Sequence, residues 1–347
     1  MKTYEKKREL TGSKVVVVGG AGFLGSHLVE HLIQDRGCKV MALDNLVAGR
    51  REYVHKAAEF IHCDITLSEW RMFNLFKGWD FVFNYAAEPY VPMSFIRPIH
   101  VFMVNAVGAM HVINAAHEAG CKGILQISSA EIYGAGWDGR QNEGTSKGRP
   151  DDLSINENGT VKPHSSYGAS KAAIDAWIQS RWMEAETPVI SLRQFNCVGE
   201  RETHPYVIPE IISQLSRQRG PALIRLGNNS FRDFLYAGDQ AVMATELLEY
   251  GEVGGIYNLG SEKGVRVYDL VPMIAKAFGT FNGFPAKHAS PVLKDEARVR
   301  PWEIWHLLSD NSKIHATIPS RPKVSLQDAI NRTVKDYIGN KERWPWE

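Results

Sequence analysis

The sequence has few cysteines and no excess of charge of either sign. Its 347 residues include only four cysteines, and no two of these lie in a CxxC pair. We therefore expect neither a metal site nor a disulfide framework, and a reducing compartment, the cytoplasm, is the simplest location. The formal net charge is +1, whereas nucleic-acid-binding proteins usually have a basic face, so no nucleic-acid partner is expected. The cysteines are Cys38, Cys63, Cys121 and Cys197.

Long apolar runs are missing as well. The longest ones, such as residues 15–18, are far shorter than the ~20 residues that a helix needs to cross a bilayer. The stretch MKTYEKKREL at the start is polar and lacks the apolar core of a secretory signal. We therefore expect no membrane partner. Hydrophobic residues make up 44% and charged residues 23%, which is the usual range for a globular protein with a full core.

The first half of the chain alternates short apolar runs with helical patterns. This rhythm predicts a doubly wound α/β fold, in which helices cover both faces of a parallel sheet. Beyond residue 197 the pattern is less regular and indicates a smaller second lobe, with helices at 209–218, 240–249 and 268–278. The expected strands are 14–18, 39–43, 60–63, 81–85, 123–127 and 189–193, and the expected helices of the first half are 25–35, 68–76, 101–119 and 170–184.

A glycine-rich turn joins the first expected strand to the first expected helix, in KVVVVGGAGFLGSHLVEHL. Gly19, Gly22 and Gly25 fit G-x-x-G-x-x-G, and Phe23 and Leu24 lie between the last two. Glycines allow the backbone to approach a pyrophosphate, and the helix N-terminus offers free N–H groups. Because the strand precedes and the helix follows, the stretch predicts a Rossmann-type dinucleotide site.

Asp44 ends the second expected strand, as a ribose-binding carboxylate of a dinucleotide site would. It can accept hydrogen bonds from both ribose hydroxyls of NAD and would repel the extra phosphate of NADP, although Arg50 and Arg51 leave an opening for NADP. Asp64, which follows the third expected strand, is an expected adenine contact, and a helix N-cap explains it as well. Their neighbours Asn45 and Ile65 are counted with the cofactor site.

Tyr167 and Lys171 lie four residues apart in YGASK, so they share one face of a helix. A lysine ammonium and the positive charge of an oxidised nicotinamide would favour the phenolate of the tyrosine. Such a phenolate can take a proton from a substrate hydroxyl while a hydride leaves the same carbon. Ser129, at the end of the strand expected at 123–127, can hydrogen-bond the same hydroxyl. The loop between these motifs, residues 135–166, is expected to be a lid or a binding loop.

Together these motifs resemble the extended short-chain dehydrogenases/reductases of the nucleotide-sugar epimerase/dehydratase family. The similarity covers nearly the whole chain and includes GGAGFLG, LDNL, AAEPYVPMSF, SSAEIYG, YGASK, LRQFNCVG, FRDFLYAGD and RPWEIWHLLSDNSK. It implies NAD as cofactor and a nucleoside-diphosphate (NDP) sugar as substrate. By this resemblance Ser129, Tyr167 and Lys171 are catalytic, Ala86, Asn105 and Lys171 line the cofactor, and Asn196, Arg232 and Arg300 hold the substrate.

The resemblance also implies how the chain is divided. Residues 1–196 would form the NAD-binding domain, with segments near 235–265 exchanged into it, and residues 197–347 would form most of the substrate lobe. A homodimer paired through two long helices is expected, here 101–119 and 170–184.

The role of the residue at the position of Glu131 distinguishes the reactions of the family. It lies two residues after Ser129, and on an extended strand both side chains would share one face. In the 4,6-dehydratases of the family, a glutamate at this place removes the C5 proton of a 4-keto sugar. Dehydratases of dTDP-glucose have an aspartate just before it, where this chain has Ala130, whereas GDP-mannose-type dehydratases do not need an acid there.

Three other readings stay open beside the dehydratase. In a 4-epimerase, Glu131 would only position Tyr133 or a water. UDP-glucuronate decarboxylases resemble the chain too, with a Ser/Thr-x-Glu at this place and an arginine at the position of Arg232. A silent relative that only binds NAD is disfavoured, because Tyr167 and Lys171 are both present.

Overall fold

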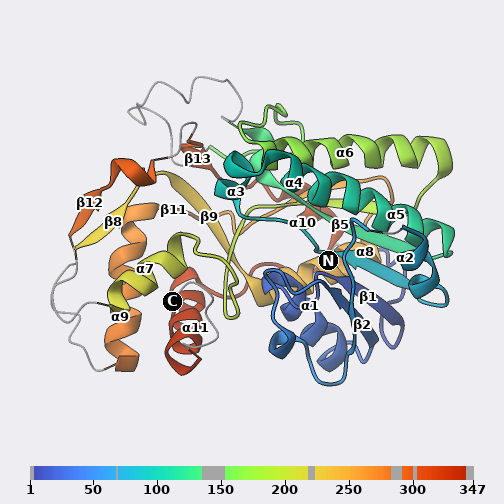
Figure 1. Ribbon diagram of the computed structural model, residues 1–347, viewed down its shortest axis with the longest axis horizontal. Coiled ribbons are helices and arrows are strands. Elements are labelled where there is room, and N and C mark those ends of the chain that lie inside the picture. The colour runs from blue at the N-terminus through green and yellow to red at the C-terminus, as the bar shows by residue number, and fades with distance from the viewer. Residues whose placement is uncertain are drawn as a thin grey trace.

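The computed structural model describes residues 4–67, 69–134, 153–217, 223–282, 291–299 and 303–340. It has two parts, a large parallel sheet flanked by helices and a smaller lobe built around α7 (Val207–Ser216), α9 (Leu270–Asn282) and α11 (Leu326–Gly339) (Figure 1). Arg300 and residues 135–152 of the expected lid lie outside the described residues.

The large sheet has seven parallel strands in the order β10-β6-β5-β4-β1-β2-β3. This arrangement confirms the doubly wound, Rossmann-like fold. The central strands are continuous apolar runs, such as KVVVV in β1, because helices cover both of their faces. The strands are β1 (Lys14–Val18), β2 (Lys39–Asp44), β3 (Glu59–His62), β4 (Phe81–Asn84), β5 (Gly123–Ser129), β6 (Val189–Gln194) and β10 (Ile256–Leu259).

Alternate residues of the strands point to opposite helix layers. Val15 and Val17 of β1 pack with α1 (Phe23–Gln34) and α8 (Ala237–Tyr250) on one face. Val16 and Val18 pack with α2 (Glu69–Phe76), α5 (Ala109–Glu118) and α6 (Ser166–Ala185) on the other. The period of two along the strand thus builds two separate cores.

The helix expected at 101–119 is longer and less regular than the sequence suggests. It is preceded by α3 (Val91–Ile96), begins as α4 (Pro98–Phe102), passes through a π-helical turn at Met103–Gly108 and continues as α5. Pro98 is tolerated because the N–H groups of the first helical turn have no hydrogen-bond partner within the helix, so the missing N–H of proline costs nothing there. Within the described residues, one helical stretch, Pro98–Glu118, would suffice by length and composition to cross a membrane, and half of its most apolar window is buried in the fold.

The smaller lobe has its own core. Strand β9 (Phe231–Tyr236) pairs with β7 (Asn196–Val198), β11 (Gly264–Arg266) and β13 (His306–Leu307), and β8 (Ile224–Leu226) pairs with β12 (Val292–Lys294). Apolar side chains of α7, α9 and α11 fill the space against these strands. Between β9 and β11 the chain returns to the large sheet, where it supplies helix α8 and the edge strand β10. The remaining helix, α10 (Ser312–Thr317), contacts α8 and β10.

Candidate active site

A cavity of about 640 Å³ lies at the carboxyl ends of the parallel strands. Its wall includes Val18, Asp44 and Ser129 from the large sheet, and Leu226 and Arg232 from the smaller lobe. In a doubly wound fold, ligands bind at this end of the sheet. The two parts of the chain therefore enclose one site.

The glycine turn is shaped by close backbone contacts. Gly19 has a φ of +79°, and a Cβ on it would lie 2.6 Å from the backbone nitrogen of Ala86. A Cβ on Gly25 would overlap the carbonyl oxygen of Gly19. Gly22 occupies the N-cap position of α1 and has no side chain with which to cap it. The first N–H groups of the helix therefore stay available to an anion in the cavity.

Asp44 is held rigidly at the end of β2. Its Oδ2 accepts a hydrogen bond from the N–H of Ala21 at 3.0 Å, and its Oδ1 accepts one from the N–H of Leu46 at 2.8 Å. Burial raises the pKa of this carboxyl above its usual value. Each carboxylate oxygen has about two lone-pair sites, so both oxygens keep capacity for a ribose hydroxyl.

The other residues near Asp44 have partners of their own. Asp64 accepts hydrogen bonds from the N–H and hydroxyl of Thr66 at 2.8 and 2.7 Å, as in a local cap, while also lining the cavity. The guanidinium of Arg50 lies 3.8 Å from Glu52, and that of Arg51 lies 4.7 Å from the ring centre of Phe60. Neither of these two contacts involves Asp44.

Tyr167 and Lys171 come from the first turns of α6. The hydroxyl of Ser165 caps this helix by accepting a hydrogen bond from the N–H of Gly168 at 3.0 Å. Tyr167 hydrogen-bonds to Ser129 through its side chain. Nζ of Lys171 donates to the carbonyl of Ile127 at 3.0 Å and lies 5.9 Å from the ring centre of Tyr167. The structure therefore brings the serine, tyrosine and lysine together.

The charges around Tyr167 act opposite to the expectation from sequence. Burial is the largest of the effects that raise its pKa to about 12; the hydrogen bond with Ser129 acts against it, and the charges of Glu131 and Glu88 act with it. Burial also lowers the pKa of Lys171 to about 8, against the attraction of Asp175. In the protein alone the phenol is therefore neutral. Only a positive charge added to the cavity, such as an oxidised nicotinamide, would favour the phenolate.

Glu131 lines the cavity, but not from a strand. Strand β5 ends at Ser129, and Glu131 lies in the 3₁₀ turn Ala130–Tyr133. The N–H of Glu131 donates to Oγ of Ser129 at 3.2 Å. The expectation that residues 129 and 131 share a strand face is therefore wrong, because the serine hydroxyl caps a turn and ends the extended chain. Both residues still line the same cavity.

Tyr133 is a structural residue. It is fully buried, its hydroxyl donates to Oδ1 of Asn258 at 2.7 Å, and it accepts a hydrogen bond from Arg193 at 2.8 Å. The turn that holds Glu131 is thereby tied to β10 and β6. No positioning of Tyr133 by Glu131 is required.

Most of the expected site residues line this cavity. Asn105 does not: it is buried behind the wall, where Oδ1 accepts from the N–H of Glu88 at 2.8 Å and Nδ2 donates to its carbonyl at 3.0 Å. In this structure it supports Glu88, which lines the cavity, and its contact with a cofactor stays a prediction. The expected residues that line the cavity are Gly19, Gly22, Phe23, Leu24, Gly25, Asp44, Asn45, Asp64, Ile65, Ala86, Ser129, Glu131, Tyr167, Lys171, Asn196 and Arg232.

Residues 15–260 match the model of the NAD dependent epimerase/dehydratase family. The chain belongs to this family. Its cofactor is therefore NAD, in agreement with the glycine turn and Asp44.

Both 4,6-dehydratases and 4-epimerases are similar to this chain over nearly its whole length. A dTDP-D-glucose 4,6-dehydratase of Mus musculus is 29% identical, with 95% of this chain and 90% of the relative covered. A putative UDP-glucose 4-epimerase of Methanocaldococcus jannaschii is 28% identical, with 95% and 99% covered. In structure, the dTDP-glucose 4,6-dehydratase DesIV of Streptomyces venezuelae, solved with NAD and TYD, matches with a TM-score of 0.82 at 25% identity and covers 96% of this chain and 99% of its own. The UDP-glucose 4-epimerase of Thermus thermophilus, solved with NAD, matches with a TM-score of 0.78 at 27% identity and 94% and 99% coverage.

In this epimerase/dehydratase, Arg232 is paired with a carboxylate of the cavity wall. Its Nη2 donates to Oε1 of Glu303 at 2.8 Å, and both side chains are buried. Asp233, its neighbour in sequence, is not the partner. That carboxylate accepts hydrogen bonds from the hydroxyls of Ser261 and Ser309 at 2.6 and 2.5 Å.

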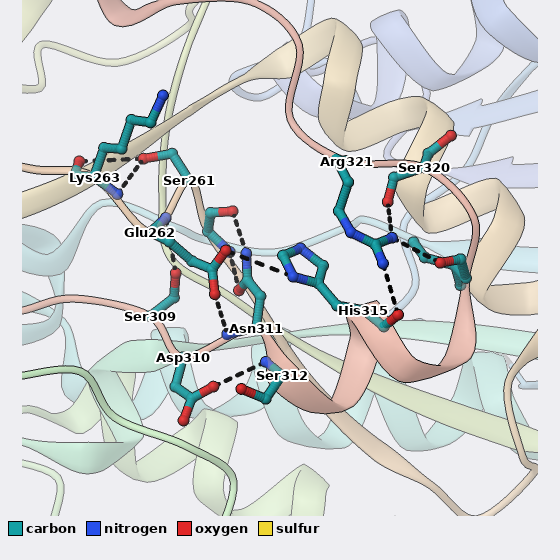
Figure 2. Close-up of polar contacts among 12 residues, drawn as sticks. Ser261, Glu262, Lys263, Ser309, Asp310, Asn311, Ser312, His315, Ser320 and Arg321 are labelled. Carbon is teal, nitrogen blue, oxygen red and sulfur yellow. Dashed lines mark hydrogen bonds and ion pairs between the residues drawn. The ribbon is translucent and has the colours of Figure 1, made fainter. Parts of the chain in front are cut away.

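The surroundings of Asp233 form a polar network that fixes two chain segments behind β9. Figure 2 shows Glu262, whose Oε1 accepts from the N–H of Asn311 at 3.0 Å and whose Oε2 lies 3.6 Å from Nδ1 of His315. The N–H of Glu262 also donates to Oγ of Ser309 at 3.3 Å (Figure 2). This network is structural, and it leaves Arg232 facing the cavity from the other side of the strand.

Several cavity residues were not found from the sequence. Glu88 lies within the quoted AAEPY stretch and could have been considered, whereas Glu202 and Glu303 are in irregular segments without periodicity. Burial raises the pKa of Glu202 to about 8. Within the described residues, Oε1 of Gln194 and Oδ1 of Asn196 are buried without a hydrogen-bond partner. Such oxygens in a cavity wall are suited to hydroxyl donors of a ligand.

Proposed function

We propose that the protein is an NDP-hexose 4,6-dehydratase that works through a 4-keto intermediate. The observation that carries this proposal is that Glu131 lines the same cavity as Ser129 and Tyr167. A 4-epimerase needs only the serine and the tyrosine, so a carboxylate beside them points to proton removal from carbon. The Mus musculus and Streptomyces venezuelae dehydratases named above support the same reading.

We assign each residue of the site a separate role in the reaction. When bound, NAD supplies the acceptor for the hydride of C4, and that hydride returns to the sugar at C6. Tyr167 takes the proton of the C4 hydroxyl, and Ser129 holds that hydroxyl by hydrogen bonding. The C4 ketone acidifies the C5 hydrogen, which Glu131 removes as the C6 oxygen leaves. Lys171 holds its ammonium 5.9 Å from the ring centre of Tyr167, and the phenolate forms only when a further positive charge enters the cavity.

The substrate end of the cavity is built from the smaller lobe and the end of the sheet. A guanidinium can hold two phosphate oxygens at once, so we assign the diphosphate to Arg232. Displacing Glu303 from Arg232 would be part of substrate binding, because a carboxylate and a phosphate compete for the same donors. Asn196 offers a buried amide oxygen to a hydroxyl of the ligand.

The alternative is a 4-epimerase. It is favoured by Ala130, which replaces the acid of dTDP-glucose dehydratases, and by the two epimerases named above. In that case Glu131 would have no chemical step of its own. A dehydratase with Ala130 must instead use Glu131 both as the base at C5 and as the acid at C6.

One experiment separates these reactions. The purified protein is incubated with NAD and a panel of NDP-hexoses and NDP-hexuronates, and the products are examined by mass spectrometry. Loss of one water from a hexose supports the proposal. An unchanged mass with altered chromatographic mobility indicates epimerisation, and loss of carbon dioxide from a hexuronate indicates decarboxylation. If no substrate changes and no transient NADH absorbance appears, the protein is a silent NAD-binding module.

We further propose that the protein is a homodimer in the cytoplasm. All four cysteines are free thiols, as a reducing compartment allows. Apolar side chains that stay exposed on α3, α4 and the π-helical turn form a surface suited to a second copy: Phe95, Ile96, Ile99, Phe102 and Met103. Light scattering at micromolar concentration should give the mass of a dimer. A monomer that instead sediments with lipid vesicles would show that this surface meets a membrane.

A further inference from the structure

We propose that the side-chain amide of Gln194 accepts a hydrogen bond from the carboxamide of the NAD nicotinamide and selects for that group. Gln194 lies at the carboxyl end of β6, and its side chain lines the cavity. The inference concerns the cofactor, which follows from the family, so it does not depend on which sugar reaction the enzyme performs.

The Gln194 amide has one fixed orientation and one unused end. Its Nε2 donates to the carbonyl of Leu259 at 3.0 Å. Because a carbonyl oxygen can only accept, the amide nitrogen must face Leu259 and Oε1 must point elsewhere. Oε1 is buried and has no hydrogen-bond partner among the described residues, in a side chain whose residue is only 8% exposed. A buried acceptor without a partner is costly, so this oxygen is suited to a donor that enters the cavity.

The strand register places Gln194 next to the serine of the active site. Gln194 of β6 pairs with Ser129 of β5. Two positions earlier on these strands, Leu192 and Ile127 both pack on the side of the sheet that α1 covers. The period of two along a strand puts Gln194 and Ser129 on that side too, and by the same rule Asp44 at the end of β2. Gln194 therefore shares the α1 side with the carboxylate suited to the ribose of NAD.

The order of the strands identifies the part of NAD that reaches Gln194. The adenosine ribose is expected at the end of β2, and the pyrophosphate at the glycine turn between β1 and α1. From β2 the sheet continues through β1, β4 and β5 to β6, so the nicotinamide half of the dinucleotide lies toward β5 and β6. The reacting carbon of its ring must meet the hydroxyl that Ser129 and Tyr167 hold, and the carboxamide is attached to the neighbouring carbon. The carboxamide is thus the cofactor group that the end of β6 receives.

This contact would make the site selective for one group of atoms. The carboxamide NH₂ has two donors, and the fixed Oε1 of Gln194 can accept from one of them. In the 3-acetylpyridine analogue of NAD a methyl group replaces the NH₂. The analogue is similar in size and charge to NAD, but it would leave Oε1 buried without a partner.

The test measures which nucleotide binds and does not rely on activity. The full chain is equilibrated with equal amounts of NAD and the acetylpyridine analogue, free nucleotide is removed by gel filtration, and the bound nucleotides are quantified by mass spectrometry. We expect the parent protein to prefer NAD about tenfold. Gln194→Met, which has a similar length and no amide, should bind the two within about twofold of each other. Gln194→Glu keeps an acceptor oxygen and should retain the preference.

Gln179→Met is the matched control. Gln179 also donates through Nε2 to a backbone carbonyl, that of Gly254 at 2.7 Å, but it does not line the cavity. This variant should keep the parent preference. Because both nucleotides compete for the same protein, a general loss of stability in Gln194→Met does not change the ratio.

Three results would overturn the inference. The first is a parent protein that binds both nucleotides alike, which needs no variant. The second is a Gln194→Met variant that keeps the tenfold preference for NAD. The third is an unchanged preference together with a higher KM for the NDP-sugar, which would assign Oε1 to a sugar hydroxyl. None of these results bears on the proposed dehydration, and a failure of every NDP-hexose to lose water would leave this test intact.

Discussion

Asn105 holds the backbone of Glu88 with both ends of its amide, accepting from the N–H at 2.8 Å and donating to the carbonyl at 3.0 Å. Asn105 lies in the π-helical turn Met103–Gly108, which presents it to the loop after β4. Glu88 in turn faces the cavity and raises the pKa of Tyr167. A π-helical turn thus holds the backbone of Glu88, whose carboxylate acts on the pKa of Tyr167.

Asn105→Ala should destabilise the fold by about 1–3 kcal/mol, because two part-buried backbone groups of Glu88 lose their partners. The loop would also relax, so kcat should fall although Asn105 does not line the cavity. Urea denaturation and steady-state kinetics check both effects. Asn114→Ala, on the next turns of the same helical region, is the matched control and should leave both near the parent values. Equal effects of the two variants would contradict the role of Asn105.

Glu131→Gln should stop the reaction after C4 oxidation. The amide keeps the shape of the side chain and cannot accept the C5 proton, so NADH absorbance should appear and persist. Solvent deuterium should not enter C5, and no dehydrated product should form. Normal turnover of this variant would favour the 4-epimerase. Failure to form NADH would place the glutamate before the C5 step and remove the main support for dehydration.

Tyr167→Phe should keep the fold and the binding of NAD and lose about 10²–10⁴-fold in kcat, because only the phenol oxygen is removed. KM should change far less. Rapid-mixing kinetics and calorimetric titration with NAD measure these quantities. A variant with turnover near that of the parent enzyme would mean that the active site lies elsewhere.

Arg232→Lys tests the diphosphate site without leaving a buried charge unpaired. A lysine can still pair with Glu303 but cannot form the planar fork, so KM for the NDP-sugar should rise about tenfold or more while the melting temperature stays close to that of the parent. Arg232→Ala should in addition lose about 3–5 kcal/mol of stability, because Glu303 is left buried alone. An unchanged KM in Arg232→Lys would show that the arginine is structural.

Glu202 should make stability fall as the pH rises. Burial raises the pKa of its carboxyl from 4.5 to about 8, so between these values the folded state binds more protons than the unfolded state. Stability therefore decreases with pH across this window. Glu202→Gln removes the effect and should gain on the order of 2–4 kcal/mol relative to the parent between pH 5 and pH 8.5. Urea denaturation of both proteins without ligand checks this, and a constant difference would contradict it.

Local sequence patterns predicted the parts of the site that depend on local rules. The glycine turn, Asp44 and the Tyr167–Lys171 spacing need only a strand, a turn and a helix, and the strands of the first half appeared at nearly the expected residues. Glu131 lines the cavity as expected, but its 3₁₀ turn was missed, because the cap by Ser129 depends on one hydroxyl and not on a periodic pattern.

Other features depend on contacts between distant segments, which periodicity does not report. The family resemblance predicted Asn105 as a cofactor residue. In the structure it lies in a π-helical turn, and its side-chain amide hydrogen-bonds to the backbone of Glu88. Arg232 pairs with Glu303, 71 positions away, and not with the adjacent Asp233. The charges that raise the pKa of Tyr167 likewise come from segments that meet only in the folded chain.

The place of β10 has a consequence for how the chain folds during synthesis. When residue 194 leaves the ribosome, the six strands made so far end at β6 as an uncovered edge, and the strand that covers it is not made until residue 259. An unpaired strand edge can pair with the edge of another chain. The native pairing of β6 with β10 joins strands that are far apart in sequence, and such pairing is slow. The nascent protein is therefore most exposed to misassembly while this segment is being translated, because the β6 side of the sheet stays uncovered until part of the smaller lobe has been made.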